Sequence, residues 1–298
     1  MIKKFELGDI RRIINMIPQK RSEGIKYIRT EKSGYYSLLS DNGELNYTML
    51  NETSKYILDS CDGTRTVGEI LDLLCVKYKD VEKEKIGADL EATLFNLTRI
   101  RVIRWKGEND MNNTPFLAQG EEKLEKEYSI SLAKESDIRI SQKMFAKFFK
   151  ETEAGEKKVK YFFGNDRREF YSFIAIRQFL YSYYKDFFLL KEDAQLMGVI
   201  VVQPSQETYL NSATIQMIDT PQDIFQQAIN AVKKYYSEAS FKKINCLRLY
   251  IPENETALES IVKESGFRLE GVMEKEYLEN INLKMYVPVS YTHLRAHE

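Results

Sequence analysis

The stretch from residue 50 to residue 105 constrains the fold more than any other part of this 298-residue chain. Thr66 and Glu69 have the spacing of a capping box, in which the two side chains satisfy backbone N–H groups at a helix start. Apolar residues then recur at helical spacing, at Ile70, Leu71, Leu74 and Tyr78. The same spacing predicts a further helix through Ile86, Leu90, Leu94 and Leu97. These helices are therefore expected to share one core.

Three short runs of alternating apolar and polar residues precede the helices. They cover Ile25–Arg29, Tyr35–Ser40 and Leu45–Leu50. Asp41-Asn42-Gly43 stands between the last two runs and consists of residues that tight hairpin turns favour. We therefore expect a small three-stranded antiparallel sheet before three helices.

The order of these pieces resembles the PqqD family of peptide-binding domains. The resemblance rests on Leu50-Asn51-x-Thr53, Asp62-Gly63-x-x-Thr66-Val67-x-Glu69-Ile70, Tyr78, Asp89-Leu90 and Leu94–Leu97. It implies a PqqD-like, winged-helix-like domain over residues 1–105. One residue departs from the family pattern: Arg101 precedes Val102-Ile103, where the family usually has a glycine. We therefore expect the end of the last helix to be shaped differently.

The PqqD resemblance also implies a partner, the leader segment of a ribosomally made precursor peptide. In that family the leader adds a strand to the edge of the small sheet and is gripped by the last helix. Main-chain hydrogen bonds then supply affinity, and pockets read a few side chains. The candidate peptide-binding residues are Tyr47, Met49, Leu90 and Leu94. The alternative is that these apolar residues only fill the core.

A sheet followed by three helices also suggests a DNA-binding regulator of the winged-helix type. The charges of the helix predicted over residues 82–99 argue against it. Lys83, Lys85 and Arg99 are outnumbered there by Glu82, Glu84, Asp89 and Glu91. Because a recognition helix needs excess positive charge to meet phosphates, nucleic acid is not expected as a partner.

Residues 106–127 are polar and include Asn-Asp-Met-Asn-Asn-Thr-Pro, which predicts a linker. Strands and helices alternate beyond it. We expect strands at Tyr128–Leu132, Phe187–Leu190, Gly198–Gln203, Tyr209–Ile218, Ile244–Ile251, Phe267–Met273 and Ile281–Val287. We expect helices at Ser141–Lys150, Asp166–Lys185, from Thr220 to about Tyr236, and at roughly Asn254–Glu264.

This order over residues 128–288 resembles the GNAT acyltransferase fold. The sharpest local likeness is Pro252-Glu253-Asn254-Glu255-Thr256-Ala257 followed by Gly266-Phe267-Arg268-Leu269-Glu270-Gly271-Val272. The expected protein is thus a two-domain α+β/α/β chain, in which a mixed sheet flanked by helices follows the PqqD-like domain.

The GNAT resemblance implies acetyl-coenzyme A, bound where Tyr209–Ile218 and Ile244–Ile251 splay apart. Its pyrophosphate would lie on backbone N–H groups at the start of the next helix. The candidate cofactor-binding residues are Met217, Ile218, Asp219, Thr220, Gln222, Phe225, Gln226 and Asn254. The loop Asp219–Ala228 contains no glycine, Pro221 lacks an N–H donor, and Thr220 and Asp223 are expected to cap the helix. Asn254 is also one residue farther from Gly266 than the family spacing.

No catalytic residue is assigned. Many GNAT proteins carry a tyrosine four residues before the Gly-Phe pair, where this chain has Val262. The two histidines, His293 and His297, lie in residues 289–298, which look like translated adapter sequence and are excluded from the fold. Without them, histidine bases and histidine metal sites are absent, and no metal site is expected.

Composition excludes several other classes of protein. Lysine plus arginine (44) nearly equals aspartate plus glutamate (45), so no basic field attracts nucleic acid or an anionic membrane. No apolar run approaches the ~20 residues that cross a bilayer. The three cysteines share no metal or redox spacing and are typical of reduced thiols. A cytoplasmic protein is expected.

Two functions remain open. In the first, the PqqD-like domain captures a precursor peptide and the GNAT-like domain N-acylates it, or a bound partner, with acetyl-coenzyme A. In the second, the protein is a non-catalytic peptide chaperone or recognition protein with a degenerate GNAT-like module, which presents the peptide to a separate maturation enzyme.

Overall fold

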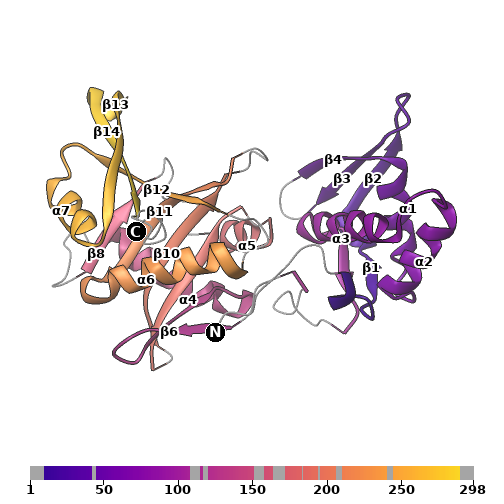
Figure 1. Ribbon diagram of the computed structural model, residues 1–298, viewed down its shortest axis with the longest axis horizontal. Coiled ribbons are helices and arrows are strands. Elements are labelled where there is room, and N and C mark those ends of the chain that lie inside the picture. The colour runs from indigo at the N-terminus through magenta and orange to yellow at the C-terminus, as the bar shows by residue number, and fades with distance from the viewer. Residues whose placement is uncertain are drawn as a thin grey trace, which may run out of the picture.

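The protein is described by a computed structural model (Figure 1). The structure describes residues 10–41, 45–107, 115–116, 120–150, 158–163, 172–182, 184–193, 195–205, 210–239 and 244–288. The expected adapter-like segment, with His293 and His297, lies outside these residues. No helix in the described parts of the chain is both long and apolar enough to span a bilayer.

The N-terminal elements confirm the predicted sheet and helices. Strands β2 (Ile25–Thr30), β3 (Tyr36–Asp41) and β4 (Leu45–Leu50) pair antiparallel in the order β2-β3-β4. Helices α1 (Glu52–Ser60), α2 (Val67–Lys77) and α3 (Lys83–Arg99) follow. Both hydrogen bonds of the Thr66–Glu69 capping box are present, so α2 starts where the sequence places it.

A short second sheet closes the core beneath the helices. β1 (Pro18–Lys20) pairs antiparallel with β5 (Ile103–Trp105), which follows α3. The buried Trp105 donates its indole N–H to Thr98 at 3.2 Å and meets Phe116 edge-on. Phe116 lies within the segment predicted as a linker, and it is 1% exposed. The exact domain and linker boundaries stay a prediction.

The end of α3 corrects one expectation. Arg101 adopts φ = 59°, the left-handed conformation that favours glycine. Arg101 N–H bonds to Thr98 O at 2.9 Å, and Val102 N–H bonds to Leu97 O at 3.1 Å. These bonds give the helix end the kind of turn that a glycine usually makes. An arginine therefore keeps the glycine-type backbone here rather than changing it.

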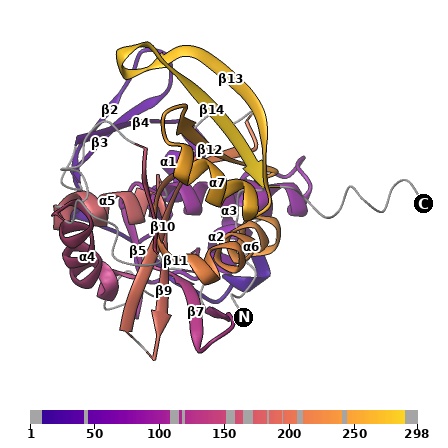
Figure 2. The same ribbon diagram turned by 90° about the vertical axis from the view of Figure 1, so that its left-hand side faces the viewer.

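The large sheet of the C-terminal half is mixed (Figure 2). Its path runs β13-β14-β12-β11-β10-β9-β7-β6. The strands are β6 (Glu121–Lys123), β7 (Tyr128–Leu132), β9 (Asp186–Glu192), β10 (Gln195–Pro204), β11 (Ser212–Pro221), β12 (Cys246–Pro252), β13 (Phe267–Tyr277) and β14 (Ile281–Pro288). β11 and β12 are parallel, whereas the other paired neighbours are antiparallel.

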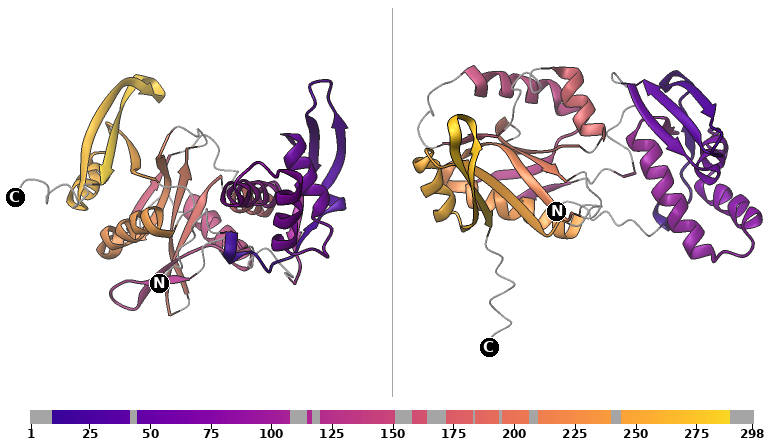
Figure 3. Two further views of the ribbon diagram at one scale, coloured as in Figure 1. Left: turned by 45° about the vertical axis from the view of Figure 1, so that its right-hand side comes forward. Right: turned by 90° about the horizontal axis from the view of Figure 1, so that it is seen from above.

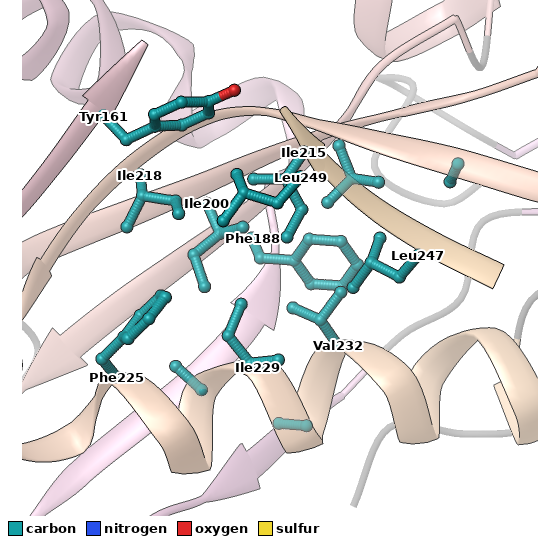
Figure 4. Close-up of a cluster of buried hydrophobic side chains, with 14 of the residues drawn as sticks. Tyr161, Phe188, Ile200, Ile215, Ile218, Phe225, Ile229, Val232, Leu247 and Leu249 are labelled. Carbon is teal, nitrogen blue, oxygen red and sulfur yellow. The ribbon is translucent and has the colours of Figure 1, made fainter. Parts of the chain in front are cut away.

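Two hydrophobic clusters lie on the faces of this sheet. α6 (Phe225–Lys234) places Phe225, Ile229 and Val232 against one face, and Figure 4 shows these side chains meeting Ile200 and Ile218. The other cluster contains side chains from α4 (Ile138–Lys150) and α5 (Phe173–Ser182) together with Val199 and Val201. α7 (Thr256–Glu264) follows β12. The alternating side chains of β10 thus supply both clusters.

Two predicted element boundaries are wrong. The described part of the aromatic helix expected over Asp166–Lys185 is α5, which ends at Ser182, while residues 164–171 and 183 lie outside the described residues. The strand expected to end at Ile218 continues to Pro221, and a 3₁₀ turn, Gln222–Ile224, separates it from α6. Thr220 is therefore a buried strand residue and not a helix cap.

We predict that Gly198→Ala destabilises the protein by about 1–3 kcal/mol. A Cβ atom at Gly198 would lie 2.4 Å from the carbonyl oxygen of Asp219, so β10 and β11 would have to move apart. Urea unfolding measures the loss. Gly271→Ala is the matched control, because its Cβ would meet only Met285 at 3.8 Å. Equal stability of the two variants would contradict the prediction.

Candidate functional site

The N-terminal sheet has two outer strands, β2 and β4, and they differ in charge. β2 carries the exposed Lys26 and Arg29, whereas β4 has no charged residue. Charged side chains on an outer strand discourage another strand from pairing with it. Of the two outer edges of this described sheet, that of β4 is therefore better suited to accept an extended chain.

Met49 lies on the exposed face of β4. Its side chain is 46% exposed, and its Sδ atom lies 3.4 Å from Ser37 Oγ on β3. Tyr47 pairs in register with Leu39 and follows the same alternation as Met49, but its side chain is outside the described parts. The structure thus brings these two predicted residues to one face of the outer strand.

Leu90 and Leu94 require a correction. Both are 0% exposed and belong to the N-terminal core, so neither side chain lies on the outer surface, although Leu90 also lines the pocket described next. The exposed residues of α3 include Lys85, Asp89, Ala92 and Asn96, which recur every three or four positions. The helical spacing correctly placed Leu90 and Leu94 on one face of α3, but that face packs against the core.

A pocket of about 250 Å³ lies between α1, the end of α2 and α3. Leu90 contributes to its lining from below, together with Ile57 and other apolar side chains. At the rim, Thr53 Oγ1 and Tyr78 Oη are 2.7 Å apart. The pocket therefore combines an apolar lining with polar groups, as sites for single side chains do.

The candidate cofactor region is shaped by the limited pairing of β11 with β12. Only Ser212–Thr214 of β11 pair with β12, in register with Cys246–Arg248. The later half of β11 pairs instead with β8 (Lys158–Phe162), an antiparallel strand (Figure 3). Met217, Ile218, Asp219 and Thr220 each have a partner on β8. The backbone that was predicted to hold the cofactor is already in a β-ladder.

Side chains fix β8 in this position. Lys158 Nζ lies 3.2 Å from Asp219 Oδ1 and 2.9 Å from Met197 O. The Tyr161 hydroxyl donates a hydrogen bond to Tyr250 O on β12, and its ring is buried beside Ile218 (Figure 4). Burial raises the pKa of Tyr161 well above its usual range. β8 thus contacts both β11 and β12.

The start of α6 is also occupied by the protein's own groups. Asp223 accepts a hydrogen bond from Lys126 at 2.6 Å, and this contact, followed by backbone N–H groups of residues 223 and 224, lowers the pKa of Asp223. A carboxylate therefore lies where the pyrophosphate was expected. Gln222 and Gln226 are exposed.

Two more predicted cofactor residues do not form a cofactor surface. Phe225 is fully buried and stacks on Phe267, with ring centroids 6.4 Å apart. Asn254 is exposed in the turn before α7. Acetyl-coenzyme A therefore does not fit the described residues, because its strand edge and its phosphate position are both taken.

Other groups that could take part in chemistry were compared within the described residues. No group of three or more His, Cys, Asp and Glu side chains among them could hold a metal ion. Val262 is wholly buried. Burial raises the pKa of the Cys61 thiol to about 12, which leaves it protonated at neutral pH.

Burial raises the pKa of the Asp186 carboxyl to about 6. Among the described residues, no other carboxyl group has a raised pKa. Tyr236 donates a hydrogen bond to Asp186 at 2.7 Å. Asp186 on β9 pairs with Val202, whereas Asp219 on β11 pairs with Val199, so β10 and three positions along it separate the two residues. Asp186 is therefore remote from the β8–β11 ladder.

Known proteins resemble the two halves separately. The family model described as Coenzyme PQQ synthesis protein D (PqqD) matches residues 35–103. Residues 35–103 are a PqqD domain. No curated protein matches the chain.

Several solved acetyltransferase structures resemble the chain. A ribosomal L7/L12 alpha-N-protein acetyltransferase in complex with coenzyme A is 17% identical, with a TM-score of 0.44 over 57% of this chain and 98% of that one. A spermidine N-acetyltransferase from Vibrio cholerae is 13% identical, with a TM-score of 0.42 over 58% of this chain and 99% of that one. A ribosomal-protein-S5-alanine acetyltransferase from Vibrio fischeri is 12% identical, with a TM-score of 0.43 over 57% and 97%.

At such low sequence identity, the likeness to these structures concerns the fold alone. The strand and helix order after the PqqD domain is the one expected from the GNAT resemblance, apart from the added strands β6 and β8. Residues 121–288 are called the GNAT-like region below. What this region can bind is decided by its own residues.

We predict that Asp186 makes the protein less stable as the pH rises from about 4 to about 6. Folding raises the pKa of Asp186 to about 6, so the folded chain holds a proton that the unfolded chain has released in this range. The loss is up to about 2 kcal/mol. Urea unfolding at successive pH values measures it. Asp186→Asn should flatten this slope, and an unchanged slope would contradict the assignment.

Proposed function

We propose that this protein binds an extended segment of a ribosomally made precursor peptide as an added strand on β4 of its PqqD domain. The observation that carries the proposal is the uncharged outer edge of β4, within the residues that match the PqqD model. Main-chain hydrogen bonds to that edge supply affinity without a fixed peptide sequence.

Side chains near this edge supply selectivity. Met49 presents a half-exposed, flexible side chain, which adapts to different apolar partners. The pocket beside Thr53, three residues beyond the end of β4, takes an apolar side chain of the same peptide. Lys85 and Asp89 at this pocket offer one charge of each sign to neighbouring peptide groups. The balance of these charges favours a peptide over nucleic acid.

N-acylation of the bound peptide with acetyl-coenzyme A is the activity that the acetyltransferase-like fold favours. The described residues oppose it, because β8 pairs with β11 and Asp223 occupies the helix start. We therefore propose that the GNAT-like region supports binding and presentation of the peptide to a separate maturation enzyme in the cytoplasm. No acyl-transfer step is assigned to it.

We predict that Met49→Lys weakens peptide binding at least tenfold, which corresponds to about 1.4 kcal/mol. The substitution replaces an exposed apolar contact on the accepting strand with a strongly hydrated charge. The probe is a fluorescein-labelled peptide from a short reading frame beside the gene, chosen by binding to the full-length chain. Fluorescence anisotropy gives the dissociation constant.

Tyr27→Lys is the matched control, since Tyr27 is 44% exposed and lies on the other outer strand, β2. It should change the affinity less than threefold. Loss of binding in Tyr27→Lys with normal binding in Met49→Lys would move the peptide to the β2 edge and overturn the proposal. Hydrogen exchange provides a second test, because bound peptide should protect amides of residues 45–50.

A further inference from the structure

The later half of β11 diverges from β12. This leaves one edge of β11 without β12 as a neighbour, in the middle of the sheet. β11 runs to Pro221, but its last residue paired with β12 is Thr214. Buried backbone N–H and C=O groups must find partners, because leaving one unpaired costs the full desolvation of that group. Some chain or ligand must therefore lie against Met217–Pro221.

We infer that β8 closes the acetyl-coenzyme A groove of the GNAT-like region from within. β8 pairs with every residue from Met217 to Pro221 and reaches β12 through Tyr161. A pantetheine arm would need the same edge of β11. β8 and the cofactor are therefore alternative occupants, and the cofactor binds only when β8 leaves.

The polar contacts at the first end of β8 make it a fixed part of the fold. Asp219 is only 5% exposed, and Lys158 provides it with a positive charge. Lys158 also donates to Met197 O on β10. Departure of β8 would remove this charge from a buried carboxylate, which proteins tolerate poorly.

Aromatic packing holds the other end. Phe163, directly after β8, stacks on Tyr250 of β12 with centroids 5.4 Å apart, and on Tyr277 of β13 at 6.3 Å. Its N–H bonds to Gln216 O at 2.7 Å, which extends the ladder by one bond. Three strands of the sheet thus contact the same short segment.

The side chains of β8 suit this position. Val159 and Tyr161 are buried in the cluster beneath α6, whereas Lys158, Lys160 and Phe162 alternate with them and are half-buried. A flexible cofactor arm would leave the volume of Val159 and Tyr161 empty. The groove is therefore complementary to a polypeptide strand with this alternation.

The test compares the wild-type protein with Lys158→Ala/Tyr161→Ala, which removes both polar contacts and the buried ring. Acetyl-coenzyme A is titrated by calorimetry, and hydrogen exchange follows amides of residues 158–163. Wild type should give no binding up to millimolar cofactor, with these amides protected. The double variant should expose them and bind acetyl-coenzyme A at least tenfold more tightly than wild type.

Lys191→Ala is the matched control, because it removes another partly buried lysine–aspartate pair, to Asp137 at 3.5 Å, away from β8. It should bind no cofactor. If the amides of β8 stay protected in the double variant, Val159→Pro replaces it, because proline removes an N–H and disrupts the strand. Circular dichroism and urea unfolding select the variants that remain folded.

Two results would overturn the inference. One is cofactor binding by wild type while residues 158–163 stay protected, since both occupants would then be present together. The other is a folded variant with unprotected β8 amides that also carries Asp223→Gly, which clears the phosphate position, and still binds no cofactor, since β8 would then not be what closes the groove. Neither result concerns peptide binding at β4, so the proposed function is tested separately.

Discussion

The C-terminal half of the structure depends on satisfying the backbone of β11. Parallel pairing with β12 covers only three residues, yet the strand continues through the centre of the sheet for seven more. β8 supplies the missing hydrogen bonds, and the consequences spread outward. The strand is extended to Pro221, Thr220 is buried, and α6 begins only at Phe225. This one pairing occupies the strand edge of the expected cofactor surface.

Local signals predicted much of the fold. The Thr66–Glu69 capping box determines where α2 begins, and the helical spacing from Ile86 to Leu97 predicts α3 correctly. Both features involve residues close together in the sequence, so they can be recognised without knowing which distant segments pack against them. Tyr128–Leu132 also forms the strand that its own residues predict.

Features that depend on distant partners were missed. Lys158–Phe162 has the alternation of a strand, but nothing in those five residues names β11 as its neighbour. Thr220-Pro221 looks like a helix start in isolation, and only the ladder with β8 makes it strand. Leu90 and Leu94 have the periodicity of a helix face, but periodicity does not distinguish a face that meets the core from one that meets a peptide.

The uncharged edge of β4 has a cost when no ligand is present. Natural outer strands usually carry lysine, proline or a bulge, which prevents two copies from pairing edge to edge. Leu45–Leu50 has neither charge nor proline, so this outer edge of the described sheet also suits a strand of another copy. In the proposed complex the bound peptide covers this edge, so it acts as a solubilising agent as well as a ligand. Self-association of the protein is thereby linked to whether the β4 edge is covered.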